Sequence, residues 1–395
     1  MEAQAADSPL KGSVRLGNYL RRLRAGYGYS LRRVEERAKA EGGEIDNSQL
    51  SRYEKGICYP SFDKLRVLAS VFNVSVQAFS DVVDLDSYEQ LKPAEGEPRV
   101  LVDEGNAALR AGEYGRAFAY YEFALDVLHQ TGTTDVEDMI DQTRVNLATA
   151  LARLGKLALA EQELRQALRG ARTIAPTLNA RALLSLANLH ADQGDLVLAE
   201  IEAEKAYSLA RSENLELLAA RSLHTLGRVL AERRQHAAAI ERYRDAGALY
   251  DACGETIEAI RVRINFGDSY VAMGKTREGI RLLRAALGEA HAAGHRRLEA
   301  QSWSNLGDAY RRANEAAQAQ ACFQQSDALA GGPERYTDIL FFNAYHEWKM
   351  AAAQGNPTRE KISFGRLKVL RSCLERRFPE VDAFDAFVER RRSDA

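Results

Sequence analysis

The sequence predicts an all-α protein in which a small N-terminal helical module precedes a long series of helical repeats. Apolar residues make up 46% of the chain, only 8 of 395 residues are Pro, and the rest is rich in helix-forming residues. Ser and Gly residues divide the first 83 residues into five short helical periods. From about residue 100, a pattern recurs at intervals near 40 residues.

Apolar residues at helical spacing predict five short helices within residues 11–83, whereas residues 1–10 offer nothing to pack and are expected to be disordered. Ser30, Ser61 and Ser75 each precede a helical period and can cap its first turn. The expected helices cover 14–25, 31–40, 47–56, a fourth segment that begins after Ser61, and a short fifth segment over 76–82.

The stretch NSQLSRYEKG at 47–56 predicts a helix with one polar, exposed face. Asn47 or Ser48 can cap its start, and Gly56 ends it. Leu50 and Tyr53 are three residues apart and can face the core together. The side chains left on the outside are Ser48, Gln49, Arg52 and Lys55.

Charge is divided unevenly along the chain. The net charge is −2, yet residues 11–80 contain 13 Lys and Arg against 7 Asp and Glu. A basic module on an acidic body suits a protein in which the module meets phosphate and the body does not.

Four segments of the module resemble the Xre, or Cro/cI-type, helix-turn-helix domain of bacterial and phage regulators. These segments are LRRLR at 20–24, YSLRRVEERA at 29–38, SQLSRYEKG at 48–56 and YPSFDKLRVLASVFNVS at 59–75. The resemblance implies that the helix at 47–56 enters a groove of double-stranded DNA, and that Arg24 pairs with Glu54 to hold that helix. The insertion KAEGGEID at 39–46 departs from the family pattern. It places three acids near the DNA face and is expected to form a longer second helix or a wing-like loop.

Residue chemistry then assigns roles on this surface. Gln49 is suited to adenine and Arg52 to guanine, while the start of the second helix at Ser30 offers backbone N–H groups to phosphate. The alternative is that Gln49 and Arg52 are simply solvated. The predicted DNA-binding residues are Ser30, Arg32, Arg33, Asn47, Ser48, Gln49, Arg52 and Lys55.

Residues 84–99 predict a linker, because Pro93, Gly96 and Pro98 stand among acids without an apolar period. Its start can continue the fifth helix, which would stiffen the joint. The predicted plan is a disordered N-terminus (1–10), a DNA-binding domain (11–83), the linker (84–99), six repeats (100–333), and a diverged seventh repeat with a capping helix (334–395).

The body resembles tetratricopeptide repeats. The segment 300–333 carries W-x2-L-G-x2-Y from Trp303 and A-x3-F from Ala319, which is the signature of that repeat. The resemblance implies a right-handed α-solenoid in which Gly307 and Phe323 belong to the core rather than to a site.

The first helix of each repeat is expected to line a concave face. Its equivalent positions form an arginine ladder and an asparagine ladder along the chain. An Asn amide can pair with a peptide backbone, and an Arg guanidinium can clamp a carboxylate. The alternative is that each Arg pairs with an acid on the adjacent repeat. The predicted ligand-binding residues are Asn146, Arg181, Asn188, Arg221, Arg228, Arg261, Asn265 and Asn305.

A DNA-binding module joined to such a body resembles the RRNPP group of peptide-sensing regulators. That resemblance implies a homodimer whose modules bind a DNA operator and whose solenoid binds a short peptide, with a small molecule or a protein as other possible ligands. The alternative is a protein-interaction scaffold in which the module dimerises or is regulated by a protein partner.

Other classes are disfavoured. His346-Glu347 lacks the second His of a HExxH zinc motif, and neither a phosphate loop nor GxSxG occurs, so no enzyme activity and no cofactor are expected. Four Cys residues without a CxxC pair predict neither a zinc site nor a disulfide framework. No apolar stretch reaches roughly 20 residues and no signal peptide is evident, which predicts a cytoplasmic protein that does not enter membranes.

Overall fold

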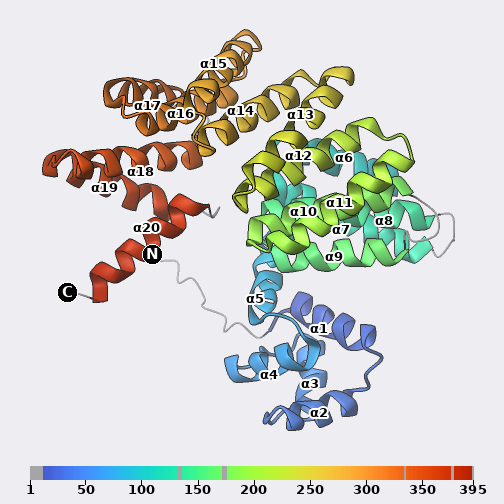
Figure 1. Ribbon diagram of the computed structural model, residues 1–395. Helices are drawn as coiled ribbons and strands as arrows, with labels where there is room; N and C mark the ends of the chain where they lie inside the picture. The colour runs from blue at the N-terminus through green and yellow to red at the C-terminus, as the bar shows by residue number, and fades with distance from the viewer. Residues whose placement is uncertain (1–11, 132–135, 171–175, 333–334, 375–377, 394–395) are drawn as a thin grey trace, which may run out of the picture. The chain divides into compact units, whose positions relative to one another are not determined.

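The computed structural model describes residues 12–131, 136–170, 176–332, 335–374 and 378–393, and every regular element in these ranges is a helix (Figure 1). This confirms the predicted all-α class. The predicted disorder of residues 1–10 lies outside the described residues. The chain divides into two units, Met1–Gly170 and Ala171–Ala395.

The N-terminal module has its helices close to where the sequence predicts them. Ser30 and Ser75 cap α2 and α5, each accepting a hydrogen bond from the backbone N–H three residues later. Ser61 stands at the start of α4 without a side-chain cap bond. The helices are α1 (Val14–Gly26), α2 (Leu31–Ala40), α3 (Asn47–Glu54), α4 (Phe62–Phe72) and α5 (Val76–Asp84).

α1 holds α3 through a buried ion pair and a close backbone approach. Arg24 donates from Nε and Nη2 to the two carboxylate oxygens of Glu54, at 2.6 and 2.9 Å. Glu54 is only 5% exposed, so this bidentate pair is largely shielded from solvent. A Cβ on Gly17 would stand 2.7 Å from the carbonyl oxygen of Glu54, so the two helices can approach this closely only at glycine. The pair implied by the resemblance is therefore present.

The start of α3 differs from the prediction. Neither Asn47 nor Ser48 caps the helix. Asp46 holds the cap position, and its carboxylate accepts a hydrogen bond from the backbone N–H of Gln49 at 2.7 Å. An Asp cap also places a negative charge at the positive end of the helix dipole. The capping residue therefore lies one position before the predicted helix.

The insertion at 39–46 is taken up by the end of α2 and a buried anchor. Ile45 is 1% exposed and fixes the segment in the core of the module. Of the three acids, Glu41 accepts a hydrogen bond from a serine of α4 at 2.6 Å, and Asp46 caps α3. Among the described residues, Glu44 alone of the three is left exposed without a hydrogen bond.

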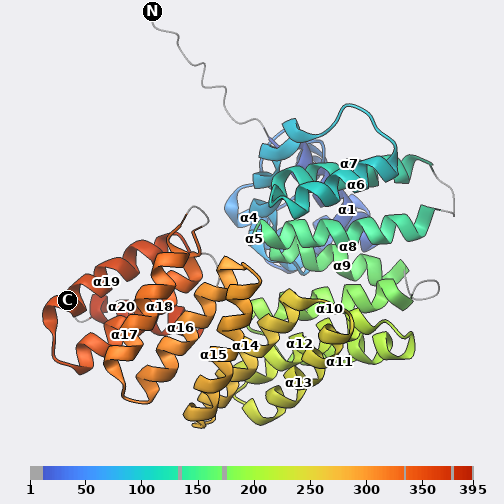
Figure 2. The same ribbon diagram turned by 90° about the horizontal axis from the view of Figure 1, so that it is seen from above.

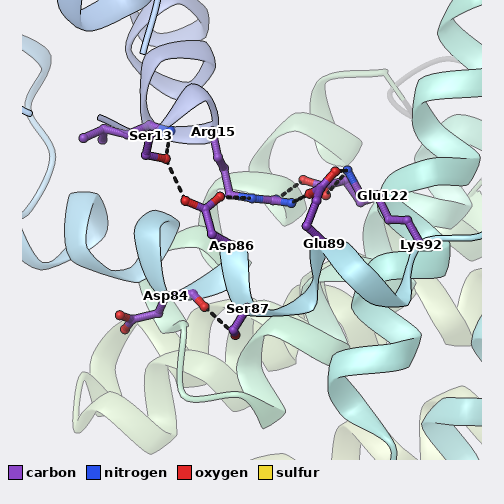
Figure 3. Close-up of polar contacts among 9 residues, drawn as sticks. Ser13, Arg15, Asp84, Asp86, Ser87, Glu89, Lys92 and Glu122 are labelled. Atoms are coloured by element: carbon purple, nitrogen blue, oxygen red, sulfur yellow. Dashed lines mark hydrogen bonds and ion pairs between the residues drawn. The ribbon is translucent and has the colours of Figure 1, made fainter. Parts of the chain in front are cut away.

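The segment predicted to be a linker is packed and ion-paired. It begins with a 3-10 helix, η1 (Leu85–Leu91), directly after α5. Arg15 of α1 donates to Asp86 at 3.1 Å, to Glu122 of α7 (Tyr114–Thr131) at 2.5 Å, and also to Glu89 (Figure 3). Lys92 bridges Glu89 and Glu122, at 3.0 and 2.9 Å. Proline, glycine and acids indicate a hinge in the sequence, yet these acids are the partners of basic residues on both sides.

The module also contacts the second helix pair of the body. Lys156, which precedes α9 (Leu157–Gly170), donates hydrogen bonds to Asp81 and Asp84 of α5 at 3.2 and 2.6 Å. Tyr19 of α1 donates its hydroxyl to Gln162 of α9 at 3.2 Å. Within the first unit, the module is therefore joined to the repeats through side chains far apart in sequence.

The body consists of helix pairs. The first unit contains α6 (Pro98–Arg110), α7 (Tyr114–Thr131), α8 (Glu137–Arg153) and α9 (Leu157–Gly170). The second unit contains α10 (Pro176–Gln193), α11 (Leu196–Ser212), α12 (Glu216–Glu232), α13 (His236–Ala252), α14 (Thr256–Ala272), α15 (Thr276–Ala292), α16 (Arg296–Arg312), α17 (Ala316–Ala330), α18 (Thr337–Ala353), α19 (Pro357–Ser372) and α20 (Pro379–Ser393). Within that unit, α10 to α19 pack against one another in chain order (Figures 1 and 2).

One contact recurs inside these pairs. A glycine of the first helix faces a ring of the second helix 16 residues later, and a Cβ on Gly307 would stand 2.5 Å from the ring of Phe323. Gly227 faces Tyr243 in the same way. Gly267, 40 residues from each of these glycines, meets the side chain of Leu283 in the equivalent place. Because these helix pairs share a close glycine contact at a step of 40 residues, the body is a tetratricopeptide-type solenoid.

The last helices enclose an aromatic cluster. Phe341 and Trp348 of α18 pack with Phe384 of α20, and α19 contributes Leu367 and Leu370. α20 therefore covers the apolar end of the final pair. Among the described residues, no single helix has the length and apolar content to cross a membrane; the pair Phe62–Phe72 and Val76–Leu91, bent by 110°, meets those two criteria only jointly.

Candidate functional site

The outward face of α3 carries free basic side chains. Arg52 and Lys55 are exposed and make no hydrogen bond or ion pair with any described residue. Asn47 and Ser48 are exposed in the first turn. A guanidinium that has no protein partner can engage a base edge or a phosphate without first losing an internal contact.

Gln49 is less available than the other predicted base-reading residues. It is half-buried, and its Oε1 accepts a hydrogen bond from Nζ of Lys64 on α4 at 2.8 Å. Bidentate recognition of adenine uses both the oxygen and the nitrogen of the amide. Lys64 therefore competes with a base for this oxygen, a contact that no local sequence pattern indicates.

The start of α2 is built as predicted, but its two arginines have a local partner. Ser30 caps the helix, and Arg32 and Arg33 both approach Glu36, at 3.5 and 3.0 Å. All three charged side chains are exposed, so these pairs are weak and can be exchanged for phosphate. Hydrogen bonding to Lys39 lowers the pKa of Glu35, and the backbone N–H of Asn47 contributes to the same shift. The beginning of α3 is thus surrounded by carboxylates.

The predicted ligand-binding residues fall into both units, and those of the second unit lie on the first helices of its pairs. Asn146 in the first unit is 8% exposed and donates to Asn106 at 3.1 Å while accepting from Gln142 at 2.9 Å. Its amide is therefore engaged within the protein.

In the second unit, several ladder residues contact the next repeat. Asn188 of α10 accepts hydrogen bonds from Thr225 and Arg228 of α12, at 3.2 and 2.9 Å. Arg228 also lies 3.4 Å from Asp192 of the preceding repeat. This pair matches the alternative prediction, in which each arginine pairs with an acid on the adjacent repeat. These contacts fix Arg228 in place and leave part of its guanidinium open.

The remaining ladder residues differ in whether their side chains already have partners within the protein. Arg181 is half-buried and engaged, and Arg261 pairs with Glu258 of its own helix at 3.0 Å. Arg221 is exposed, and Asn305 is half-buried. Neither Arg221 nor Asn305 forms a hydrogen bond or ion pair with another described residue.

A half-buried histidine, not identified from the sequence, supports the asparagine ladder. Asn265 donates to Nε2 of His224 at 3.0 Å. Burial lowers the pKa of His224 to about 3, and the nearby Arg228 and Arg261 add to the shift. The imidazole is therefore neutral at physiological pH, and its Nε2 serves as an acceptor. The sequence signal that could have identified His224 is its position on α12, one residue before Thr225.

Acidic groups gather further along the same helices. Asp308 of α16 pairs with Arg311 and Arg312 at 2.6 and 2.7 Å, and it lies 3.6 Å from His346 of α18. Burial opposes ionisation, but His346, Arg312 and Arg311 hold the pKa of Asp308 below its usual range. Glu380 of α20 lies 3.7 Å from the other nitrogen of His346.

All four cysteines lie among the described residues. Cys58, Cys253, Cys322 and Cys373 are all free thiols. Among the described residues, no three His, Cys, Asp or Glu side chains are grouped in a way that could hold a metal ion.

The fold and these faces define a helix-turn-helix protein with a tetratricopeptide-repeat body. Residues 15–79 match a helix-turn-helix domain family, and residues 145–214 and 264–333 match a tetratricopeptide repeat family. No curated protein matches the chain.

Three solved structures illustrate the likeness in fold. The apo form of RapI is 12% identical, with a TM-score of 0.58 over 70% of this chain and 97% of that one. Aspartyl phosphate phosphatase F from Bacillus subtilis is 15% identical, with a TM-score of 0.57 over 95% and 97%. A Rap protein in complex with competence and sporulation factor is 14% identical, with a TM-score of 0.55 over 70% and 76%. At these identities the likeness concerns the fold alone.

Proposed function

We propose that this protein is a sequence-specific DNA-binding transcriptional regulator. The observation that carries the proposal is α3 itself: it is clamped to α1 through Arg24 and Glu54, while Arg52 and Lys55 extend from it unpaired. A rigid helix with free basic side chains is what reading a DNA groove requires. We further propose that it acts as a cytoplasmic homodimer that places two α3 helices on an operator.

Selection of bound fragments from random double-stranded DNA by the full-length protein tests this proposal. We expect one enriched motif with two half-sites about one helical turn apart, and an affinity that falls steeply as salt rises. Enrichment without any shared motif, or no binding at low salt, would contradict it.

We also propose that a short peptide bound to the first helices of the second unit modulates DNA binding. The free guanidinium of Arg221, the Asn305 amide and the neighbouring Arg228 support it, because they offer carboxylate and backbone recognition on one set of helices. A similar fold, the Rap protein, was solved with competence and sporulation factor bound, which is a property of that protein.

Arg221→Ala tests the ligand face. We expect the variant to bind the selected DNA like the wild type, and to lose the change in DNA affinity that synthetic peptides from the protein's own genomic neighbourhood cause. Arg244→Ala, an exposed arginine of α13, is the matched control and should respond normally. A normal response of Arg221→Ala would remove this residue from the ligand site.

A second candidate is a protein-interaction scaffold with a module that does not read DNA. It is favoured by the carboxylates of Asp46 and Glu35 at the start of α3 and by the hydrogen bond that occupies Gln49. The salt titration distinguishes the two functions, since a scaffold would show no salt-dependent DNA binding even in dilute buffer.

A further inference from the structure

One row of equivalent positions changes its charge along the second unit. At a step of 40 residues the first helices of successive pairs carry Asn188, Arg228, Asp268 and Asp308, which we name the 188–308 row. Arg221 and Arg261 lie near its basic half. The charges of both arginines influence the pKa of Tyr250, and Arg261 also influences the pKa of His224, together with Arg228 of the row. The same helices thus present a basic half on α12 and an acidic half on α14 and α16.

Asp268 is the unusual member of this row. It is half-buried, yet it forms no hydrogen bond or ion pair with any described residue. Burial raises the pKa of Asp268 to about 6; the charge of Asp308 adds to this, Arg312 opposes it and Glu380 adds again. A half-buried carboxylate without a partner is costly to the fold, and a cation placed beside it would reduce that cost.

The charged groups around Asp268 are already committed to other partners. Arg311 and Arg312 both pair with Asp308, so neither guanidinium is used by Asp268. Glu380, on α20, has only His346 within ion-pairing distance, at 3.7 Å. Asp268 and Glu380 are therefore two carboxylates on different helices, and neither forms a hydrogen bond among the described residues.

His346 gives an independent indication that something polar belongs at this place. It is 5% exposed, and neither of its ring nitrogens has a hydrogen-bond partner. Its nitrogens lie 3.6 Å from Asp308 and 3.7 Å from Glu380, which is beyond hydrogen-bonding distance. A buried imidazole with two unused nitrogens between carboxylates is expected where a ligand group completes the network.

We propose that Asp268 and Glu380, with His346 between the helices that carry them, form a subsite for the ammonium group of an extended peptide, either its amino terminus or a lysine side chain. Asn305, one turn before Asp308, is free to hold the adjoining backbone amide. Arg221 and Arg228 receive a carboxylate of the same peptide at the basic half of the row. The peptide direction is thereby fixed, with its amino end toward α16 and α20 and its carboxyl end toward α12. This assignment rests on the proposed peptide ligand.

The charge and geometry select an organic cation of this kind. Three carboxylates, Asp268, Asp308 and Glu380, face two guanidinium groups, so one negative charge is left over. An ammonium group has three donors and can bond two carboxylates and an imidazole together. A metal ion is less suited, because no three ligating side chains in the described part of the chain are grouped for one.

A peptide library tests the assignment. The full-length protein is mixed with a library of random seven-residue peptides that have free termini, bound peptides are recovered by gel filtration, and they are sequenced by mass spectrometry. We expect the wild type to enrich Lys or a free amino terminus at one end and a carboxylate at the other. Asp268→Asn should lower the enrichment of basic groups at least fivefold and leave the carboxylate preference unchanged.

Two further variants separate the possible outcomes. Arg221→Gln should do the reverse, losing the carboxylate preference and keeping the basic one. Glu380→Gln should repeat the effect of Asp268→Asn, which keeps the test valid if the latter variant does not fold. If Asp268→Asn and Glu380→Gln both retain the basic preference, the subsite is wrong although the peptide ligand stands. If the wild type enriches no peptide, the proposed peptide ligand itself fails, and the subsite with it.

Discussion

At the scale of single residues, the structure separates free side chains from engaged ones. Arg52 and Gln49 are three positions apart on α3 and have similar sequence signals. Arg52 is exposed and unpaired, while Gln49 is half-buried and bonded to Lys64. The difference arises because Lys64 lies on α4, and the sequence pattern of α3 carries no information about that helix.

We expect Arg52→Ala to weaken binding to the selected operator by about 1–3 kcal/mol and to relax the preference at one base pair, because one base-edge contact is lost. Competition binding against every single-base variant of the operator measures both effects. Arg99→Ala, an exposed arginine of α6, removes the same charge and should have little effect. An unchanged base preference in Arg52→Ala would exclude Arg52 from the reading set.

Asp268 should make the fold depend on pH. Because its pKa is raised from 3.8 to about 6 in the folded state, its contribution to stability is fully present below pH 3.8 and is lost as pH rises through about 6. The charged neighbours that influence the pKa of Asp268 are Asp308 and Arg312 on α16 and Glu380 on α20.

We therefore expect Asp268→Asn to raise the free energy of unfolding at pH 7.5 by roughly 1–2 kcal/mol, after allowance for partial solvent exposure, and to have almost no effect at pH 4. Urea unfolding at the two pH values measures the change. Asp245→Asn, at an exposed and unpaired position on α13, is the control and should show no such difference. Equal effects of Asp268→Asn at both pH values would contradict the shifted pKa.

At the scale of helices, the repeat depends on a small residue facing a large one. Gly307 and Phe323 meet so closely that a methyl group at 307 would overlap the ring, and α10 and α11 solve the same problem with buried Ala187 and Ala203. The two helices can approach only when the summed volume at this contact is kept.

We expect Gly307→Ala to lower the free energy of unfolding by about 1–3 kcal/mol through overpacking. A second substitution, Phe323→Leu, should recover part of this loss, because Leu283 occupies the equivalent place against Gly267. Gly288→Ala, on an open part of α15, should instead stabilise the protein by a few tenths to 1 kcal/mol. Urea unfolding of Gly307→Ala, of the double variant and of Gly288→Ala measures these changes. An unchanged free energy of unfolding in Gly307→Ala would show that the contact between residues 307 and 323 is loosely packed.

At the scale of the whole molecule, the joint between the module and the first repeats lies between α1 and the helices of the body, so the proposed peptide signal would pass through it. The acids of η1 and α7 surround Arg15, and Lys92 completes the network (Figure 3). A packed joint of this kind can transmit a change in the first repeats to α1, and α1 in turn holds α3.

We expect Arg15→Gln to loosen this joint, since three carboxylates lose their shared partner. Amide hydrogen exchange should become several-fold faster in residues 85–91 and stay unchanged in α12, and peptides should then have less effect on DNA affinity. Arg99→Gln, which removes an unpaired charge, serves as the control. Unchanged exchange in residues 85–91 would show that apolar packing, rather than Arg15, holds η1.

Local patterns in the sequence were enough to predict the all-α class, the helices of the module, the 40-residue repeat and the outward position of Arg52 and Lys55. These features follow from local spacing, capping residues and periodicity, which act over a few turns of helix. The Arg24–Glu54 pair came from the family resemblance, and the structure contains it.

Which side chains already have partners became clear from the packing of the helices. It showed that Asp46 rather than Asn47 caps α3, and that Asp86 and Glu89 are partners of Arg15. It also showed that Asp268 has no ion pair, while Asp308 pairs with two arginines. The physical reason is that a hydrogen bond or ion pair depends on distances between helices, and residues 40 to 107 positions apart meet only after the helices have packed.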